Sequence, residues 1–269
     1  MRSIDKLKEE MIELLPKMDS SHFDPQVFSL SGVMVIRNAM DASTVMTWKN
    51  EYKRQIEKEQ SRYKSYHPVE FLDLKDGLDG IWRNPRILQV VSKIFGPNVG
   101  LFKRRFVIKD KNFRGTVFLH QDTAYQIGTV EKTSVFIAIS EAGPQNGGMI
   151  FYPGTFRFGY LGDAGEINRQ VLPSDWPTLH PALKPGDMAL MHSLTWHESS
   201  NFVEGPDRIL TDFIYQNAED PSTIEVVAGH GGWSPNFLNG GRGQNFQTSL
   251  FKRSRTTIIQ DLKQQLESN

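Results

Sequence analysis

The sequence contains no cysteine among its 269 residues. This absence excludes disulfides, thiolate nucleophiles, CxxC redox chemistry and every zinc or iron–sulfur site that uses cysteine ligands. A metal ion held by this chain would therefore be bound by histidine and carboxylate side chains.

The chain also lacks an excess of charge of either sign, because 31 Lys and Arg residues balance 31 Asp and Glu residues. Without net charge there is no general attraction to phosphate backbones or anionic lipids, so we expect no nucleic-acid partner and no membrane partner. No apolar run approaches the roughly 18 residues of a membrane span, and the charged residues 1–18 lack the apolar core of a signal peptide. We expect a cytoplasmic protein with a small-molecule substrate.

Composition and length favour one globular unit. The chain is 38% hydrophobic and 23% charged, which excludes a disordered or low-complexity protein. Because β-rich barrels reach about 250 residues as single units, we expect one domain over residues 1–269.

Helical and strand-like patterns occupy different parts of the chain. Residues 1–100 contain amphipathic or capped helical segments, and we expect them to form a mostly helical outer layer. Residues 101–216 consist of short β-prone runs separated by Gly, Pro, Asn and Asp clusters, which predicts a sandwich or barrel core. Residues 217–269 read as a loop and a C-terminal helix. The amphipathic ends, 3–18 and 254–267, would pack on the barrel or on a second subunit of a homodimer.

Two His-x-Asp tripeptides occur, at residues 22–24 and 120–122. Two histidines and one carboxylate on one face bind iron(II) and leave positions open for a cosubstrate and oxygen. The first tripeptide lies in a predicted loop, whereas the second ends the strand-like run 116–120. We therefore favour His120 and Asp122 as ligands, although an isolated pair of this kind is also typical of a hydrogen-bonded strand end.

The third ligand must come from another histidine, and the candidates are His180, His192 and His197. Only His197 is followed by Ser199 two positions later and by Arg208 eleven positions later. A hydroxyl and a cation suit the distal carboxylate of 2-oxoglutarate, to which Arg offers a bidentate fork. Simpler roles remain open at this point, since Ser199 also suits a turn and Arg208 also suits a surface ion pair.

The order of these motifs resembles a known family. FLHQD (residues 118–122), NGGMIFYPGTF (146–156) and LKPGDMALMHSLTWHESSN (183–201), followed by Arg208, look like the phytanoyl-CoA dioxygenase family of iron(II)- and 2-oxoglutarate-dependent oxygenases. The resemblance covers roughly residues 30–216. It implies a mainly β fold with flanking helices, namely the double-stranded β-helix or jelly-roll barrel, which is cupin-like.

The same resemblance implies roles for five residues. His120, Asp122 and His197 would bind Fe(II) at the catalytic centre, and Arg208 and Ser199 would hold the distal carboxylate of 2-oxoglutarate. Related halogenases have a small residue at the position of Asp122, so the carboxylate present here favours oxygenation over halogenation.

The sequence departs from the family pattern at two places that carry no proposed ligand. Residues 197–199 read His-Glu-Ser where the family often has His-Gly-Ser. Residues 153–156 read Pro-Gly-Thr-Phe where a Pro-Gly-Ser-His turn is common.

Further residues are candidates for the pocket around the metal. Strand alternation places Lys103 and Arg105 on one face, and one of them would contact the cosubstrate or an anionic substrate group. Solvated charges on an outer sheet are the alternative. The candidate substrate-lining residues are aromatic: Tyr125, Phe136, Trp196 and Trp233.

The sequence therefore predicts a non-haem Fe(II)- and 2-oxoglutarate-dependent dioxygenase. With O2 it would hydroxylate an unactivated C–H bond of a small organic molecule, a secondary metabolite, and release succinate and CO2. The same cofactors would also support desaturation, cyclisation, epoxidation or multistep oxidation of a natural-product scaffold. A non-catalytic jelly-roll binding protein is the alternative from another class, and it predicts no succinate release.

Overall fold

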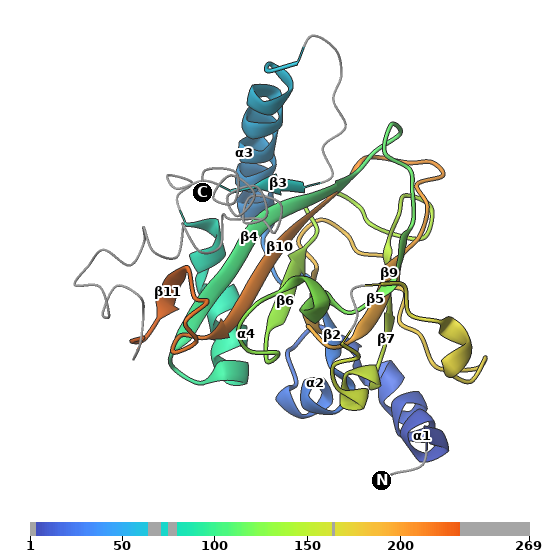
Figure 1. Cartoon of the computed structure of the whole chain (residues 1–269). Helices are drawn as coiled ribbons and strands as arrows, with labels where there is room; N and C mark the ends of the chain where they lie inside the picture. Colours follow the sequence, from blue (N-terminus) through green and yellow to red (C-terminus); the bar gives the residue numbers. More distant parts are fainter. Residues whose placement is uncertain (1–3, 64–70, 75–79, 163–164, 232–269) are drawn as a thin grey trace, which may run out of the picture.

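The computed structural model describes residues 4–63, 71–74, 80–162 and 165–231, and in this part of the chain two β-sheets face each other (Figure 1). The larger sheet runs β1–β2–β8–β6–β10–β4–β11, with β3 also paired to β4, and the smaller sheet runs β5–β9–β7. The strands are β1 (Asp19–Ser20), β2 (Val33–Ile36), β3 (Phe71–Asp73), β4 (Val99–Lys109), β5 (Val117–His120), β6 (Thr133–Ile137), β7 (Met149–Tyr152), β8 (Met188–His192), β9 (Trp196–Ser199), β10 (Arg208–Asn217) and β11 (Glu225–Ala228). The helices are α1 (Ile4–Leu14), α2 (Pro25–Ser31), α3 (Ala42–Gln60) and α4 (Pro85–Phe95), with short 3₁₀ turns η1 (Leu15–Lys17), η2 (Ile81–Arg83), η3 (Asp122–Tyr125), η4 (Thr155–Phe158) and η5 (Arg169–Val171).

Strands β4 and β10 form the long antiparallel ladder of the larger sheet (Figure 1). Their register pairs Lys109 with Arg208 at one end and Val99 with Asn217 at the other, with one irregularity at Ile214. Because successive side chains point to opposite faces, this ladder sends every second residue toward the smaller sheet.

The outer face of the larger sheet is covered by α3 and α4. Trp48 and Tyr52 of α3 pack edge-on against Phe213 and Phe106, with ring centroids 6.5 and 5.5 Å apart. Ile87 of α4 joins the same buried cluster. This layer leaves the inner face of the ladder free to build a pocket between the two sheets.

The observed architecture confirms the predicted mainly β, jelly-roll fold with flanking helices. Helices α1 to α4 all lie within residues 1–100, and β2 from the same segment belongs to the larger sheet, where it is paired to β8. Residues 254–267, expected to be helical, lie outside the described residues. No helix in the described part of the chain is long and apolar enough to cross a membrane.

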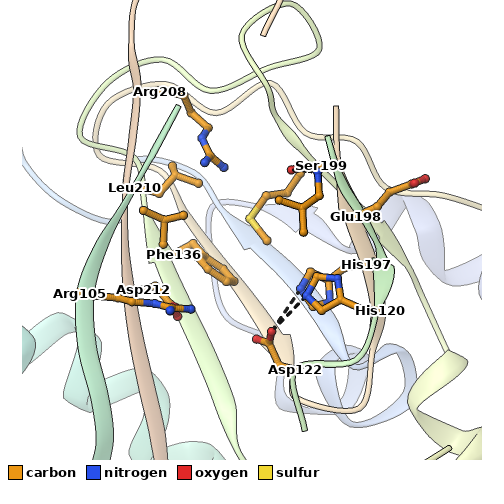
Figure 2. Close-up of a pocket in the computed structure, with 13 residues that line it drawn as sticks. Arg105, His120, Asp122, Phe136, His197, Glu198, Ser199, Arg208, Leu210 and Asp212 are labelled. Carbon is orange, nitrogen blue, oxygen red and sulfur yellow. Dashed lines mark hydrogen bonds and ion pairs between the residues drawn. The ribbon is translucent and has the colours of Figure 1, made fainter. Parts of the chain in front are cut away.

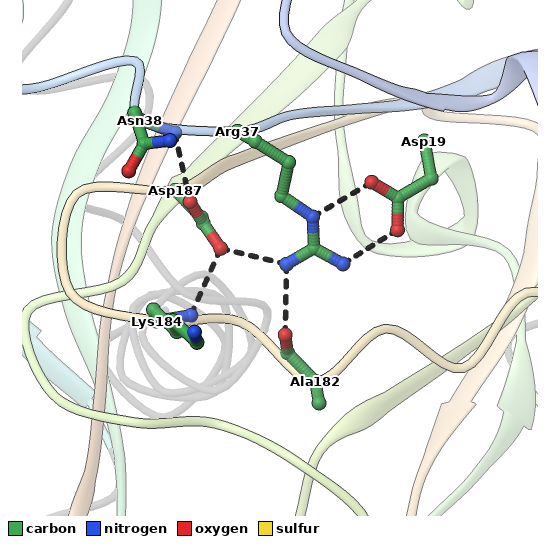
Figure 3. Close-up of polar contacts among 6 residues, drawn as sticks. All are labelled: Asp19, Arg37, Asn38, Ala182, Lys184 and Asp187. Carbon is green, nitrogen blue, oxygen red and sulfur yellow. Dashed lines mark hydrogen bonds and ion pairs between the residues drawn. The ribbon is translucent and has the colours of Figure 1, made fainter.

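A network around Arg37 ties the N-terminal segment to the barrel (Figure 3). The Arg37 guanidinium donates to Asp19 (2.7 Å) and to Asp187 (2.6 Å). The other oxygen of Asp187 accepts from the backbone N–H of Asn38, and the backbone N–H of Lys184 also donates to the carboxylate. Asp187 is buried, whereas Asp19 is about one-third exposed. The turn at Gly186 and Asp187 is therefore a structural junction between the N-terminal segment and the barrel.

We predict that Asp187→Ala lowers the free energy of unfolding by about 3 kcal/mol, because it leaves two backbone N–H groups without their acceptor and removes the buried one of the two carboxylates that pair with the half-buried Arg37 guanidinium. Asp19→Ala should lower it by only about 1 kcal/mol, since this carboxylate is partly solvated. Urea unfolding of both variants measures the difference, and equal losses would contradict the junction role of Asp187.

Candidate active site

Three side chains from separate segments converge between the sheets (Figure 2). His120 is the last residue of β5, Asp122 begins η3, and His197 lies on β9. The pairing of β5 with β9 places His120 directly opposite His197. Asp122 Oδ1 lies 3.5 Å from His120 Nε2 and 3.6 Å from His197 Nε2.

Both imidazole rings are held in the orientation that a metal ligand needs. Nδ1 of His120 donates to the carbonyl of Phe118 (2.7 Å), and Nδ1 of His197 donates to the carbonyl of Thr195 (3.1 Å). A carbonyl can only accept, so in each neutral ring the proton lies on Nδ1 and Nε2 carries the free lone pair. Both free lone pairs belong to the nitrogens nearest Asp122.

The charges of the three groups are strongly coupled. Burial opposes charge on Asp122, but His197 and the hydrogen bond from His120 outweigh burial and hold the pKa of Asp122 well below its usual value. Burial, and then the charge of His120, lowers the pKa of His197 to about 4. Burial also acts against charge on His120, but Asp122 outweighs it and raises the pKa of His120. The Asp122 carboxylate therefore favours positive charge beside it, as a bound cation would supply.

These three residues fit a divalent metal ion. Their ligating atoms all lie within 4.8 Å of one another. Three ligand atoms at right angles around an ion, each about 2.1 Å from it, would lie about 3 Å from one another. The three ligating atoms therefore need to move only slightly closer together to bind an ion. Two imidazoles and one carboxylate on one face are the ligand set of non-haem Fe(II) centres with open positions.

Gln121, between two of the ligands, is buried and fully engaged. Its side-chain amide donates to the carbonyls of Gly159 and Leu194, and its oxygen accepts from the backbone N–H of Leu161. Sequence reasoning assigned no role to this residue. Its contacts hold the turn between His120 and Asp122 against two other segments.

The pocket beside the three ligands has the inner face of the β4–β10 ladder as one of its walls (Figure 2). Four successive inward-facing pairs line up along this ladder: Lys109 with Arg208, Val107 with Leu210, Arg105 with Asp212, and Lys103 with Ile214. Successive pairs are about 6.6 Å apart along the strands. The wall therefore alternates from a cationic end, through an apolar pair, to the Arg105–Asp212 ion pair.

The cationic end contains a side chain that the sequence analysis missed. Lys109 is buried, and its ammonium donates to Ser199 Oγ (2.7 Å) and to the carbonyls of Gly115 and Ser200. The backbone N–H of Val117 also donates to Ser199 Oγ (3.3 Å). Because both lone pairs of this hydroxyl are used, its own hydrogen is available to an acceptor in the pocket.

The structure brings most of the predicted site residues together. Arg105, Phe136, Ser199 and Arg208 line the pocket with the three ligands. Tyr125 is exposed, and its ring contacts the ring of His120 edge-on at 5.9 Å.

Three other predicted residues have different positions. Lys103 lies one pair beyond Arg105 on the same ladder, and its burial lowers its pKa. Trp196 is not brought to this pocket; it lines a separate hollow beside Phe158. Trp233 lies outside the described residues.

Strand alternation is the sequence signal that could have identified Lys109 and Asp212 as residues of the pocket wall. Lys109 has the same strand parity as Lys103 and Arg105, and Asp212 has the same parity as Arg208. Alternation carried to the ends of both strands would have placed them inward.

A model of the phytanoyl-CoA dioxygenase (PhyH) family matches residues 25–204. No curated protein matches the chain in sequence.

Solved structures similar to this chain include two enzymes from nogalamycin biosynthesis and EctD. The epimerase SnoN from nogalamycin biosynthesis, in complex with Fe³⁺, α-ketoglutarate and nogalamycin RO, has 16% identity and a TM-score of 0.62, covering 78% of this chain and 86% of its own. The non-haem α-ketoglutarate-dependent carbocyclase SnoK has 14% identity and a TM-score of 0.62, with 80% and 88% covered. EctD from S. alaskensis, with 2-oxoglutarate and 5-hydroxyectoine, has 17% identity and a TM-score of 0.61, with 73% and 76% covered. At these identities the likeness shows the fold.

We predict that His197→Ala weakens binding of Fe(II), or of Mn(II) as a stable substitute, by roughly 100-fold or more, because two donors cannot complete the facial set. His192→Ala is the matched control: His192 also ends a strand, but it pairs with Glu131. Anaerobic calorimetry measures both affinities. Equal binding by the His197 variant and the wild type would show that the metal lies elsewhere.

Proposed function

Because the chain belongs to the phytanoyl-CoA dioxygenase family, we propose that it is a non-haem Fe(II)- and 2-oxoglutarate-dependent oxygenase that hydroxylates an unactivated C–H bond of a small organic molecule. When bound, Fe(II) and 2-oxoglutarate supply the activation of O2, with succinate and CO2 as co-products. The observation that carries the proposal is one continuous pocket that joins the His120–Asp122–His197 face to the buried cationic end at Arg208.

The cationic end suits the distal carboxylate of 2-oxoglutarate. Arg208 is buried and offers a planar fork for a carboxylate. Lys109 and Val117 donate to the Ser199 hydroxyl, so its own hydrogen is available to the carboxylate. Arg208 thus supplies the positive charge, and Ser199 supplies a directional hydrogen bond. Lys109 acts here as a positioning residue, because it orients the Ser199 hydroxyl.

The apolar section between the two ends suits the methylene carbons of the same cosubstrate. Val107, Leu210, Met149 and Val117 line the pocket there. These side chains offer no hydrogen bonds, so a dianion would be held at its two ends and not at its middle. Such packing excludes water from the space beside the ligand face.

We predict that the wild-type protein, titrated anaerobically with Fe(II) and then with 2-oxoglutarate, develops the weak visible charge-transfer band of the chelate. Arg208→Gln should weaken 2-oxoglutarate binding roughly 30-fold, about 2 kcal/mol, because a charge-assisted contact is lost. Arg54→Gln, on the exposed face of α3, is the control and should bind normally. A folded, Fe(II)-loaded wild type without the band would favour the binding-protein alternative.

The Ser199 hydroxyl should make a smaller contribution to the same binding. Ser199→Ala removes one neutral donor and should weaken 2-oxoglutarate binding roughly fivefold, about 1 kcal/mol. Ser200→Ala is matched in sequence, but its hydroxyl donates to the carbonyls of Pro144 and Gly148, and it should leave the affinity unchanged. Equal effects of the two variants would contradict a role for Ser199 in the pocket.

Hydroxylation has a distinct product mass. Among candidate small molecules, a substrate should stimulate succinate release and yield a product heavier by one oxygen atom. Mass spectrometry of the product checks this prediction. A product lighter by two hydrogens would indicate desaturation or ring closure, and one of unchanged mass would indicate epimerisation.

A further inference from the structure

Asp212 is a buried carboxylate that the proposed cosubstrate site does not use. It lies on the inner face of β10, is 1% exposed and lines the pocket between the sheets (Figure 2). Arg105 Nε donates to its Oδ2 at 2.6 Å. Its Oδ1 is also buried, and within the described residues it has no hydrogen-bond partner.

A buried carboxylate oxygen without a donor is costly, because it loses its hydration and receives nothing in return. Donors from a bound molecule remove this cost. The Arg105 ion pair holds the carboxylate in place on a strand whose inner face lines the pocket.

The surroundings of Asp212 combine opposite charges. Burial and the neighbouring Asp122 raise the pKa of Asp212, while Arg105 and Lys103 oppose this effect. Asp73, which is exposed, lies opposite Arg105 in the register of β3 with β4, and its charge also acts on Arg105. Arg105 therefore interacts with more than one carboxylate. A further anion bound beside Asp212 would be repelled by two of these carboxylates.

The position along the ladder separates Asp212 from the cosubstrate end. It lies four residues along β10 from Arg208, about 13 Å away along the strand. The register of β6 with β10 pairs Val135 with Phe213, and one further step places Phe136 beside Asp212. Phe136 also lines the pocket, so a donor group bound at Asp212 would have an aromatic ring next to it.

We propose that Asp212 is a substrate-recognition residue, whose Oδ1 accepts a hydrogen bond from a hydroxyl or protonated amino group on a ring-containing substrate. This inference rests on the proposed function, since it takes the space between Asp212 and the ligand face as the substrate site. It excludes a carboxylate or phosphate at this position. Arg105 acts as the positioning residue for the Asp212 carboxylate.

The test uses four small probes with one carbon skeleton: cyclohexylamine, cyclohexanol, cyclohexanone and cyclohexanecarboxylate. The protein is the full chain loaded with Mn(II) and saturated with 2-oxoglutarate. Paramagnetic broadening of each probe's proton signals measures its binding near the metal. We expect the amine and the alcohol to bind roughly tenfold more tightly than the ketone and the carboxylate, since one buried charged hydrogen bond is worth about that factor.

Two variants assign the preference. Asp212→Asn keeps the shape and one oxygen acceptor but removes the charge, so it should abolish the preference for the amine while retaining part of that for the alcohol. Asp73→Asn changes the exposed carboxylate on the other side of Arg105 and should leave the ranking unchanged. Circular dichroism confirms that both variants are folded.

Three results would overturn the inference: tightest binding of cyclohexanecarboxylate, an unchanged ranking in Asp212→Asn, or no probe bound while the signals of 2-oxoglutarate are broadened. The first would assign Arg105 to an anionic ligand. If 2-oxoglutarate itself shows no broadening in the Mn(II)-loaded wild type, the proposed function fails as well, and the two failures are therefore distinct.

Discussion

The antiparallel pairing of β5 with β9 is the contact on which the site depends. It brings His120 opposite His197, although the two residues are far apart in sequence. A register shift of one residue would turn one of these imidazoles away from the pocket and break the ligand set. The backbone carbonyls of Phe118 and Thr195 then orient the rings, so the same two strands supply both the ligands and their positioning. The larger sheet forms the opposite wall of the pocket.

That sheet provides a wall whose chemistry changes at every second residue. On the inner face of β4 and β10, a cationic pair, an apolar pair and an ion pair follow in order. Strands are well suited to this task because side-chain spacing along them is regular and the backbone is held by hydrogen bonds on both sides. Helices α3 and α4 contribute indirectly, since they bury the outer face and leave the inner face for function.

The fold and the metal ligands were predictable because their signals are local or ordered along the chain. Short β-prone runs with turns indicated the barrel, and the placement of His120, Asp122, His197 and Arg208 within ordered motifs indicated the site. The prediction that Trp196 lines this pocket did not take strand alternation into account. Trp196 is adjacent to His197 on β9, and neighbouring residues on a strand face opposite sides. Alternation along β4 and β10 is enough to place Lys109 and Asp212 on the inner face, but the hydrogen bonds of Lys109 to Ser199 and of Arg105 to Asp212 join segments far apart in the chain, which no single segment of sequence encodes.

Under the proposed function, the ladder would let one fold keep its cosubstrate site while its substrate site changes. Arg208 and Asp212 lie on the same face of the same strand, so their separation is set by strand geometry and does not depend on loops. A substitution at Asp212 alters the part of the pocket beside Phe136 and Arg105, while Lys109 keeps its hydrogen bond to Ser199 and its strand pairing with Arg208. If Arg208 binds the cosubstrate and Asp212 the substrate, as proposed above, the two recognition functions would be separable along one strand.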